Sequence, residues 1–448
     1  MGKKNKNEIK TSQKQGKKSK VLFNFLNVKF DNLDQRTVKN HIFLLILASL
    51  ATKFIVIFVT TAIFHSFIDY FDIGTYFNHM IPLLSGQIPY VNYQIEYPIL
   101  TFIPLLLAFI PAVLTQNGAA FIFSFQILMA LCDILIVLCI YIIGLKIWNE
   151  TTAFCAGLIY ATAFSTAYFV LTKSDAFPTC ILMVAILFTV YGMNTRGYIF
   201  GTLGFFTKIF PAIALPFMIL NNAKSTSLKQ ELVSAGKIFL LLCVVLLLPF
   251  ILINPDVIRT YLFATGGSVG VYANTITYTL YAYLHDVFHM GITPAAISII
   301  MYVLMGITFI FLVYIACVAS EKDPKTLLKL ILCAIFCSVF FTKFHSPQYI
   351  VWFTPFLALL VADDLIKIGL FYLAQIFAYI EFPLMFGGYY TNLEYTNPIG
   401  SSGWYLTVLF FTLQYVVLMT LMYFTVRPQE GIIPRLQEYY SISSRKQR

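Results

Sequence analysis

Two carboxylates three residues apart open the first long polar stretch of the chain. Asp69 and Asp72 follow an apolar segment, and Glu96 comes later in the same stretch, residues 65–97, which contains no Lys or Arg. A spacing of three places Asp69 and Asp72 on one face of a helix. Such a pair can act as a general base or bind a divalent cation. The structural alternative is a helix cap or a solvated acidic rim.

The composition makes these few charges conspicuous. Of 448 residues, 59% are hydrophobic and 11% are charged, whereas soluble domains contain about 25% charged residues. This excludes a soluble enzyme, a secreted disulfide scaffold, a nucleic-acid-binding module and a disordered protein. Membrane lipids are therefore expected partners and nucleic acid is not. The eight cysteines lie in apolar segments and have no metal-ligand spacing.

Apolar runs predict an all-α polytopic membrane protein with about twelve transmembrane helices, within a range of eleven to thirteen. The run near 98–115 is interrupted by proline, and we expect it to lie in the outer interface, as part of a long first extracytoplasmic loop. The predicted spans are 42–65, 119–145, 154–172, 177–192, 198–207, 210–221, 238–254, 293–318, 329–343, 349–362, 366–386 and 404–426.

The charge distribution orients these spans. The first 20 residues contain eight Lys and one Glu, and a polybasic segment before the first span is typical of a cytoplasmic terminus. We expect cytoplasmic tails at 1–41 and 427–448 around a membrane domain at 42–426. The external loops then fall at about 65–118, 173–176 and 255–292.

This orientation leaves four bases on the external side, where cations are depleted. They are Lys173, Lys208, Arg259 and Lys343. An anionic partner at the outer face would explain them, and pairing with nearby Asp or snorkelling to water is the alternative.

Two further charges lie inside predicted spans. Lys53 and Asp133 each fall near the midplane, where an unpaired charge is costly. We expect them to pair, or Asp133 to be capped by hydroxyls, in a structural role; a proton or ion relay is the alternative.

Four motifs of the chain resemble those of GT-C-type integral-membrane glycosyltransferases and occur in the same order. The resemblance spans residues 42–362 and is nearest to prokaryotic polyprenyl-phosphomannose-dependent mannosyltransferases, and more distantly to the first mannosyltransferase of GPI-anchor assembly. The motifs are Asp72-Ile73-Gly74 with Tyr76, Gly86–Tyr90 and Glu96-Tyr97-Pro98; Ser174–Pro178; Gly204–Pro211; and Lys343–Tyr349 with Trp352 and Pro355.

The resemblance implies transfer of a hexose, with mannose expected, from a polyprenyl-phosphate donor to an acceptor hydroxyl, with inversion. It implies that Asp72 is the base, with Asp69 as the alternative, and that Asp175 is a second carboxylate. Whether Asp72 and Asp175 hold a divalent cation, Mg²⁺ or Mn²⁺, stays open, because family members differ in whether a cation bridges these two carboxylates. The four external bases, with Lys173 the weakest, become candidates for binding the donor phosphate.

Aromatic and amide side chains near the last motif are candidates for sugar or lipid contacts, because a pyranose has one apolar side and several hydroxyls. An aromatic belt at the interface is the alternative. These candidates are Gln348, Tyr349, Trp352 and His345, with Tyr90 and Glu96 expected mainly to shape the first loop.

The implied enzyme is a multi-pass protein of the prokaryotic cell membrane; the endoplasmic reticulum membrane is the less favoured alternative. Both termini are expected to be cytoplasmic and the active site extracytoplasmic. A glycan, a glycolipid and a protein are all compatible acceptors. The rival functions are a transporter or lipid-linked-sugar flippase, and a noncatalytic membrane subunit. A transporter needs ionisable groups along a path through the membrane, and only Lys53 and Asp133 qualify.

Overall fold

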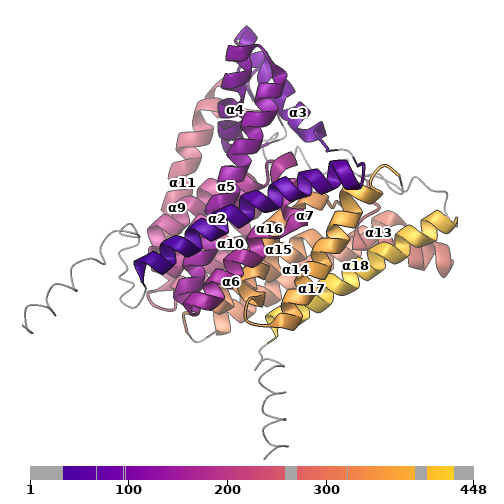
Figure 1. Cartoon of the computed structure of the whole chain (residues 1–448). Coiled ribbons are helices and arrows are strands. Elements are labelled where there is room, and N and C mark those ends of the chain that lie inside the picture. The colour runs from indigo at the N-terminus through magenta and orange to yellow at the C-terminus, as the bar shows by residue number, and fades with distance from the viewer. Residues whose placement is uncertain are drawn as a thin grey trace, which may run out of the picture.

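The computed structural model of the chain is an all-helical bundle (Figure 1). It describes residues 34–66, 68–93, 95, 97–257, 270–319, 321–388 and 401–427. No β-strand occurs among these residues, and a β-bridge joins Pro89 to Tyr93.

Sixteen α-helices are present in the described residues. They are α2 (Gln35–Phe58), α3 (Phe71–Met80), α4 (Phe102–Thr115), α5 (Gly118–Ile147), α6 (Glu150–Ala161), α7 (Phe164–Thr172), α8 (Ala176–Val190), α9 (Asn194–Phe205), α10 (Ala214–Asn222), α11 (Leu228–Ile253), α13 (Ile276–Tyr281), α14 (Pro294–Val318), α15 (Pro324–Phe340), α16 (Ile350–Val361), α17 (Leu365–Tyr379) and α18 (Ser402–Val426).

Short 3-10 and π turns extend or join several of these helices. The 3-10 turns are Ile81–Ser85, Ile99–Thr101, Phe210–Ile213 and Pro347–Tyr349, and the π turns are Val59–Ile63, Ala282–Val287 and Ile380–Met385.

The chain is a polytopic membrane protein, and a helix lies at each of the twelve predicted spans. Six helices of the described residues are long and apolar enough to cross a membrane, and seven if the bent α6–α7 pair is one span. Several others, including α4 and α8, are apolar but shorter than the roughly 20 residues that a crossing normally needs. The number of crossings therefore stays a prediction.

Several helices begin before the expected spans, as α11 does at Leu228 rather than at 238, and one expected span is bent. α2 begins at Gln35 rather than at 42, because the Asp34 carboxylate caps it by accepting from the backbone N–H of Arg36 and Thr37. The expected span 154–172 is bent by 56° between α6 and α7. At this bend the Thr162 hydroxyl donates to the Leu158 carbonyl, an alternative backbone partner that often bends helices.

The bundle is built around α16, in which all twelve residues are buried. α2 packs across α5, α6 and α7 and runs diagonally over one side of the molecule (Figure 1). A second, smaller core lies under α3, α4 and the first half of α5, where Ile73, Tyr76 and Met80 of α3 are buried. The segment near 98–115 is thus a helix that packs beside α5, and its depth in the membrane stays a prediction.

Lys53 and Asp133 meet inside the bundle. The Lys53 ammonium lies 2.5 Å from Asp133 Oδ2, and both side chains are buried. Hydroxyls of Ser49 and Tyr160 also donate to this carboxylate, at 2.8 and 2.9 Å. The two charges therefore neutralise each other within a complete hydrogen-bond network between α2, α5 and α6.

Removing one charge of this pair should destabilise the protein strongly. Lys53→Met leaves Asp133 without its counter-ion, which should cost about 3–5 kcal/mol of unfolding free energy. Thermal unfolding of the purified protein measures the loss, with exposed Leu50→Ala on α2 as the control. A Lys53→Met protein as stable as Leu50→Ala would show that the pair has no structural role.

Candidate active site

A lysine bridges the two carboxylates of the first loop. The Lys173 ammonium, at the end of α7, lies 2.7 Å from Asp69 Oδ2 and 3.1 Å from Asp72 Oδ2. Asp69 Oδ1 also accepts from the backbone N–H of Phe71, the first residue of α3, but the N-cap residue of this helix is Tyr70 and no side chain caps it. Asp72, in the first turn of α3, forms no cap, which leaves its second oxygen available to a substrate.

Burial dominates the electrostatics of Asp72. Burial raises the pKa of Asp72, and the charge of Lys173 together with its hydrogen bond opposes this rise. The negative charges of Asp69 and Asp175 add to it. A carboxylate with a raised pKa is a better proton acceptor, while the adjacent ammonium favours its ionised form.

A second lysine–carboxylate pair lies directly beside the first. Asp175 is fully buried, and its Oδ1 accepts from the Lys208 ammonium at 2.6 Å and from the Trp352 indole N–H at 2.5 Å. Asp175 precedes α8 but does not cap it. Its other oxygen, Oδ2, is buried and has no hydrogen-bond partner among the described residues.

Stacked aromatic rings form the floor under Lys208. The Trp352 ring lies 4.1 Å from the Phe210 ring, nearly parallel to it, and 3.9 Å from the Tyr349 ring. The Lys208 ammonium is 5.1 Å from the centre of the Trp352 ring and 5.8 Å from that of Tyr349. These contacts fix the position of a cation whose side chain is one quarter exposed.

Three consecutive residues join these groups. Lys173 binds the first-loop carboxylates and Asp175 binds Lys208, while Ser174 between them forms a 3.1 Å hydrogen bond with the Tyr76 hydroxyl. All three are buried in the short segment between α7 and α8. The four motifs, separated by up to about 280 residues of sequence, therefore meet at one place.

Lys173 and its two carboxylate partners, Asp69 and Asp72, face a cleft of about 290 Å³. One wall consists of residues of the first loop and of α7. The other wall consists of residues 346–348, the π turn Ile380–Met385 and Phe386, which follows this turn. The lining residues are Asp69, Phe71, Asp72, Phe169, Lys173, Ser346, Pro347, Gln348, Phe382 and Phe386. In this wall the Gln348 amide oxygen accepts from the Ser346 hydroxyl at 2.5 Å.

Sequence reasoning missed the apolar part of the cleft. Phe169, Phe382 and Phe386 lie in apolar segments, where nothing distinguishes a lining residue from a core residue. It also missed Glu381, which is buried and accepts from the amides of Asn274 and Gln414 at 2.7 and 2.5 Å. The break at Pro383 was the one available signal of a special site near the end of this span.

The other expected site residues have separate positions. His345 lies behind the cleft, with Nε2 3.9 Å from Glu381 Oε1 and its ring edge-on to Tyr349. The backbone carbonyl of Lys343 accepts from the N–H of Tyr272. The Tyr90 hydroxyl bonds to the Tyr97 carbonyl, which closes the first loop on itself.

Two expected residues cannot be placed. Arg259 and Glu96 lie outside the described residues.

The described residues do not assemble a site for a metal ion. No group of three or more His, Cys, Asp or Glu side chains could hold one in the part of the chain that the structure describes. Asp72 and Asp175 each face a lysine ammonium instead.

Comparison with known proteins gives a distant likeness to a solved structure. No protein-family model and no curated protein matches the sequence. The fold is similar to the crystal structure of the Archaeoglobus fulgidus oligosaccharyltransferase in its apo form, with 13% identity and a TM-score of 0.41 over 87% of this chain. The match covers 57% of the archaeal chain, less than two thirds of its length. A likeness this distant leaves the function to be inferred from the residues.

The buried position of His345 predicts a pH-dependent stability. Burial lowers the pKa of His345 to about 4, below an unfolded value of about 6.5. The unfolded chain therefore binds the proton more readily, and this residue weakens folding as the pH falls from about 6.5 to 4, by about 3 kcal/mol at most.

Thermal unfolding at pH 7.5 and pH 5 measures this effect. His345→Gln should lose less stability on acidification than the wild type, and the exposed His285→Gln should behave as the wild type does. Equal acid sensitivity of His345→Gln and wild type would contradict a neutral buried imidazole.

Proposed function

We propose that this protein is a membrane glycosyltransferase. It transfers a hexose, with mannose as the expected sugar, from a polyprenyl-phosphate carrier to an acceptor hydroxyl at the extracytoplasmic face of the cell membrane. The observation that supports this best is the convergence of four distant motifs on adjoining lysine–carboxylate pairs. A core without a site has no need of three carboxylates and two lysines in one place, of which Asp175 and Lys173 are buried and the other three partly buried.

Asp72 is the proposed base. It takes the proton of the acceptor hydroxyl while the acceptor oxygen bonds to the anomeric carbon. The bond from that carbon to the phosphate oxygen breaks, and its electron pair leaves with the polyprenyl phosphate. Inversion needs one such displacement and no covalent sugar–enzyme intermediate. Asp69 and Lys173 hold Asp72 in position through their shared ion pairs.

Lys208 is the proposed partner of the leaving phosphate. Its ammonium is fixed above Trp352 and Tyr349, and its side chain is one quarter exposed. A fixed cation stabilises the charge that develops on the departing phosphate oxygen. Lys173, expected from the sequence as a weaker phosphate ligand, has contacts that suit the counter-ion of Asp69 and Asp72 better. Gln348 on the facing wall suits a sugar hydroxyl.

The transporter alternative has less support. Its candidate relay, Lys53 and Asp133, forms a closed ion pair with Ser49 and Tyr160. A relay needs groups that exchange partners along a path, whereas this network is complete in itself.

Asp72→Asn should abolish transfer and leave donor binding intact. An amide cannot take the proton, so turnover should fall by about 10²–10⁴-fold. The assay is transfer of radiolabelled mannose from polyprenyl-phosphomannose to a total lipid and glycan extract of the source cells. Asp363→Asn, a half-exposed carboxylate paired with Lys367, is the matched control and should keep full activity.

The pH–rate profile adds an independent readout. Because the pKa of Asp72 is raised, the wild-type rate should begin to fall on acidification above the usual carboxylate range. Full activity in both Asp72→Asn and Asp69→Asn would rule out the proposed base.

A further inference from the structure

An apolar groove runs along the side of the bundle between α2 and α17. Its volume is about 630 Å³, and its walls include Ile55 and Val59 on one side and Ile376 and Leu384 on the other. The hydroxyl of Tyr379 at its base is hydrogen-bonded to Thr60. The groove therefore offers a ligand an almost wholly hydrocarbon surface, which suits a lipid chain.

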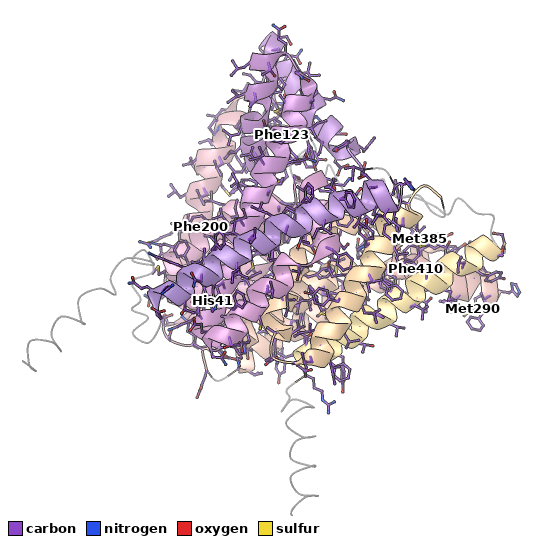
Figure 2. The ribbon with its side chains drawn as sticks, in the orientation of Figure 1. His41, Phe123, Phe200, Met290, Met385 and Phe410 are labelled. Atoms are coloured by element: carbon purple, nitrogen blue, oxygen red, sulfur yellow. The ribbon has the colours of Figure 1, made fainter. Side chains whose placement is uncertain are left out.

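Both walls of this groove are close in the sequence to residues that line the cleft. Phe64, at the end of the α2 wall, comes five residues before Asp69. On the other wall, Leu384 lines the groove while Phe382 and Phe386 line the cleft. In the view of Figure 2 the label of Met385, which lies between Leu384 and Phe386 in the sequence, falls near the end of α2.

Tyr168 lies at the junction of groove and cleft. Its hydroxyl accepts from the backbone N–H of Asp69 at 3.0 Å. Its ring is edge-on to Tyr379, which lines the groove, and to Phe382, which lines the cleft, at 6.4 and 6.0 Å. This one buried ring therefore separates Tyr379 in the groove from Asp69 in the cleft, so the end of a chain in the groove lies close to the Asp69–Lys173 ion pair.

The charge at this end of the cleft suits a hydroxyl better than a phosphate. Asp69 and Asp72 share one ammonium, that of Lys173. Two carboxylates against one cation repel an anion and accept hydrogen bonds from hydroxyls. Lys208, the partner proposed for the phosphate, is held by Asp175 and does not line this cleft.

The stereochemistry points the same way. In an inverting displacement the attacking oxygen and the leaving group lie on opposite faces of the sugar. The proposed base, Asp72, must therefore lie on the face of the sugar that the acceptor attacks. The groove ends near Asp69 and Asp72, on this acceptor side.

We infer that the acceptor is itself a lipid, whose apolar chain lies in the α2–α17 groove and whose head group presents a hydroxyl to Asp72. This inference rests on the proposed glycosyl transfer and adds the class of acceptor to it. The donor chain then occupies a different surface.

Filling the groove tests the inference. Ile376→Trp on α17 puts an indole into it, and Leu373→Trp is the matched control, because Leu373 lies one turn earlier with a similar exposure, 38% against 46%, and does not line the groove. Ile55→Trp fills the groove from the α2 side and guards against misfolding of a single variant. The purified full-length proteins receive radiolabelled polyprenyl-phosphomannose and the lipid fraction of the source cells.

The label should appear in lipid. The KM for the acceptor lipid should rise about tenfold in Ile376→Trp and Ile55→Trp, the loss of roughly two buried methylene groups. The KM for the donor should stay unchanged, and Leu373→Trp should behave as the wild type does.

Three results would overturn the inference and leave the proposed function standing. They are label found in protein or polysaccharide instead of lipid, a rise in the donor KM in place of the acceptor KM, and equal behaviour of Ile376→Trp, Ile55→Trp and Leu373→Trp. Absence of transfer by folded wild type from any polyprenyl-linked sugar would overturn the proposed function, and the inference with it.

Discussion

The site depends on a reversal of the chain between α7 and α8 in which three successive side chains each bind a different partner. Lys173 reaches back to the first loop, Ser174 to Tyr76 and Asp175 to Lys208 and Trp352. All three residues are buried, so none can leave its partner without exposing a polar group to an apolar core. This segment keeps the base and the phosphate-side lysine at a fixed separation.

The aromatic stack adds rigidity on the other side of Asp175. Trp352 belongs to α16, the most deeply buried helix, and its indole N–H has one possible direction once its ring is packed between Phe210 and Tyr349. Asp175 is thereby oriented by a helix that is buried along its whole length. The cleft itself is lined by other residues, from the first loop, α7, residues 346–348 and the segment 382–386.

Much of this architecture could be read from the sequence, because the bilayer imposes a strong pattern. Long apolar runs gave the helices, and charges in such a chain are rare enough that Asp72, Asp175 and Lys208 stood out. The binding partner of each charged side chain could not be predicted in the same way. Lys173 could bind a phosphate or Asp69, and only the bend between α6 and α7 and the turn after α7 decide its direction. Phe169 and Phe382 could not be predicted to line the cleft, because a Phe that lines a cleft and a Phe in the core follow the same sequence periodicity.

The Lys208–Asp175 pair has a consequence for product release. In the proposed reaction the donor is a phosphodiester with one negative charge, and the product phosphate is a monoester with a charge of about −1.5 to −2. A lysine that attracts the donor therefore attracts the product more strongly. Asp175 lies 2.6 Å from the same ammonium and competes for it throughout. The carboxylate thus acts as an internal substitute for the departing phosphate, which limits how tightly the spent carrier can be held.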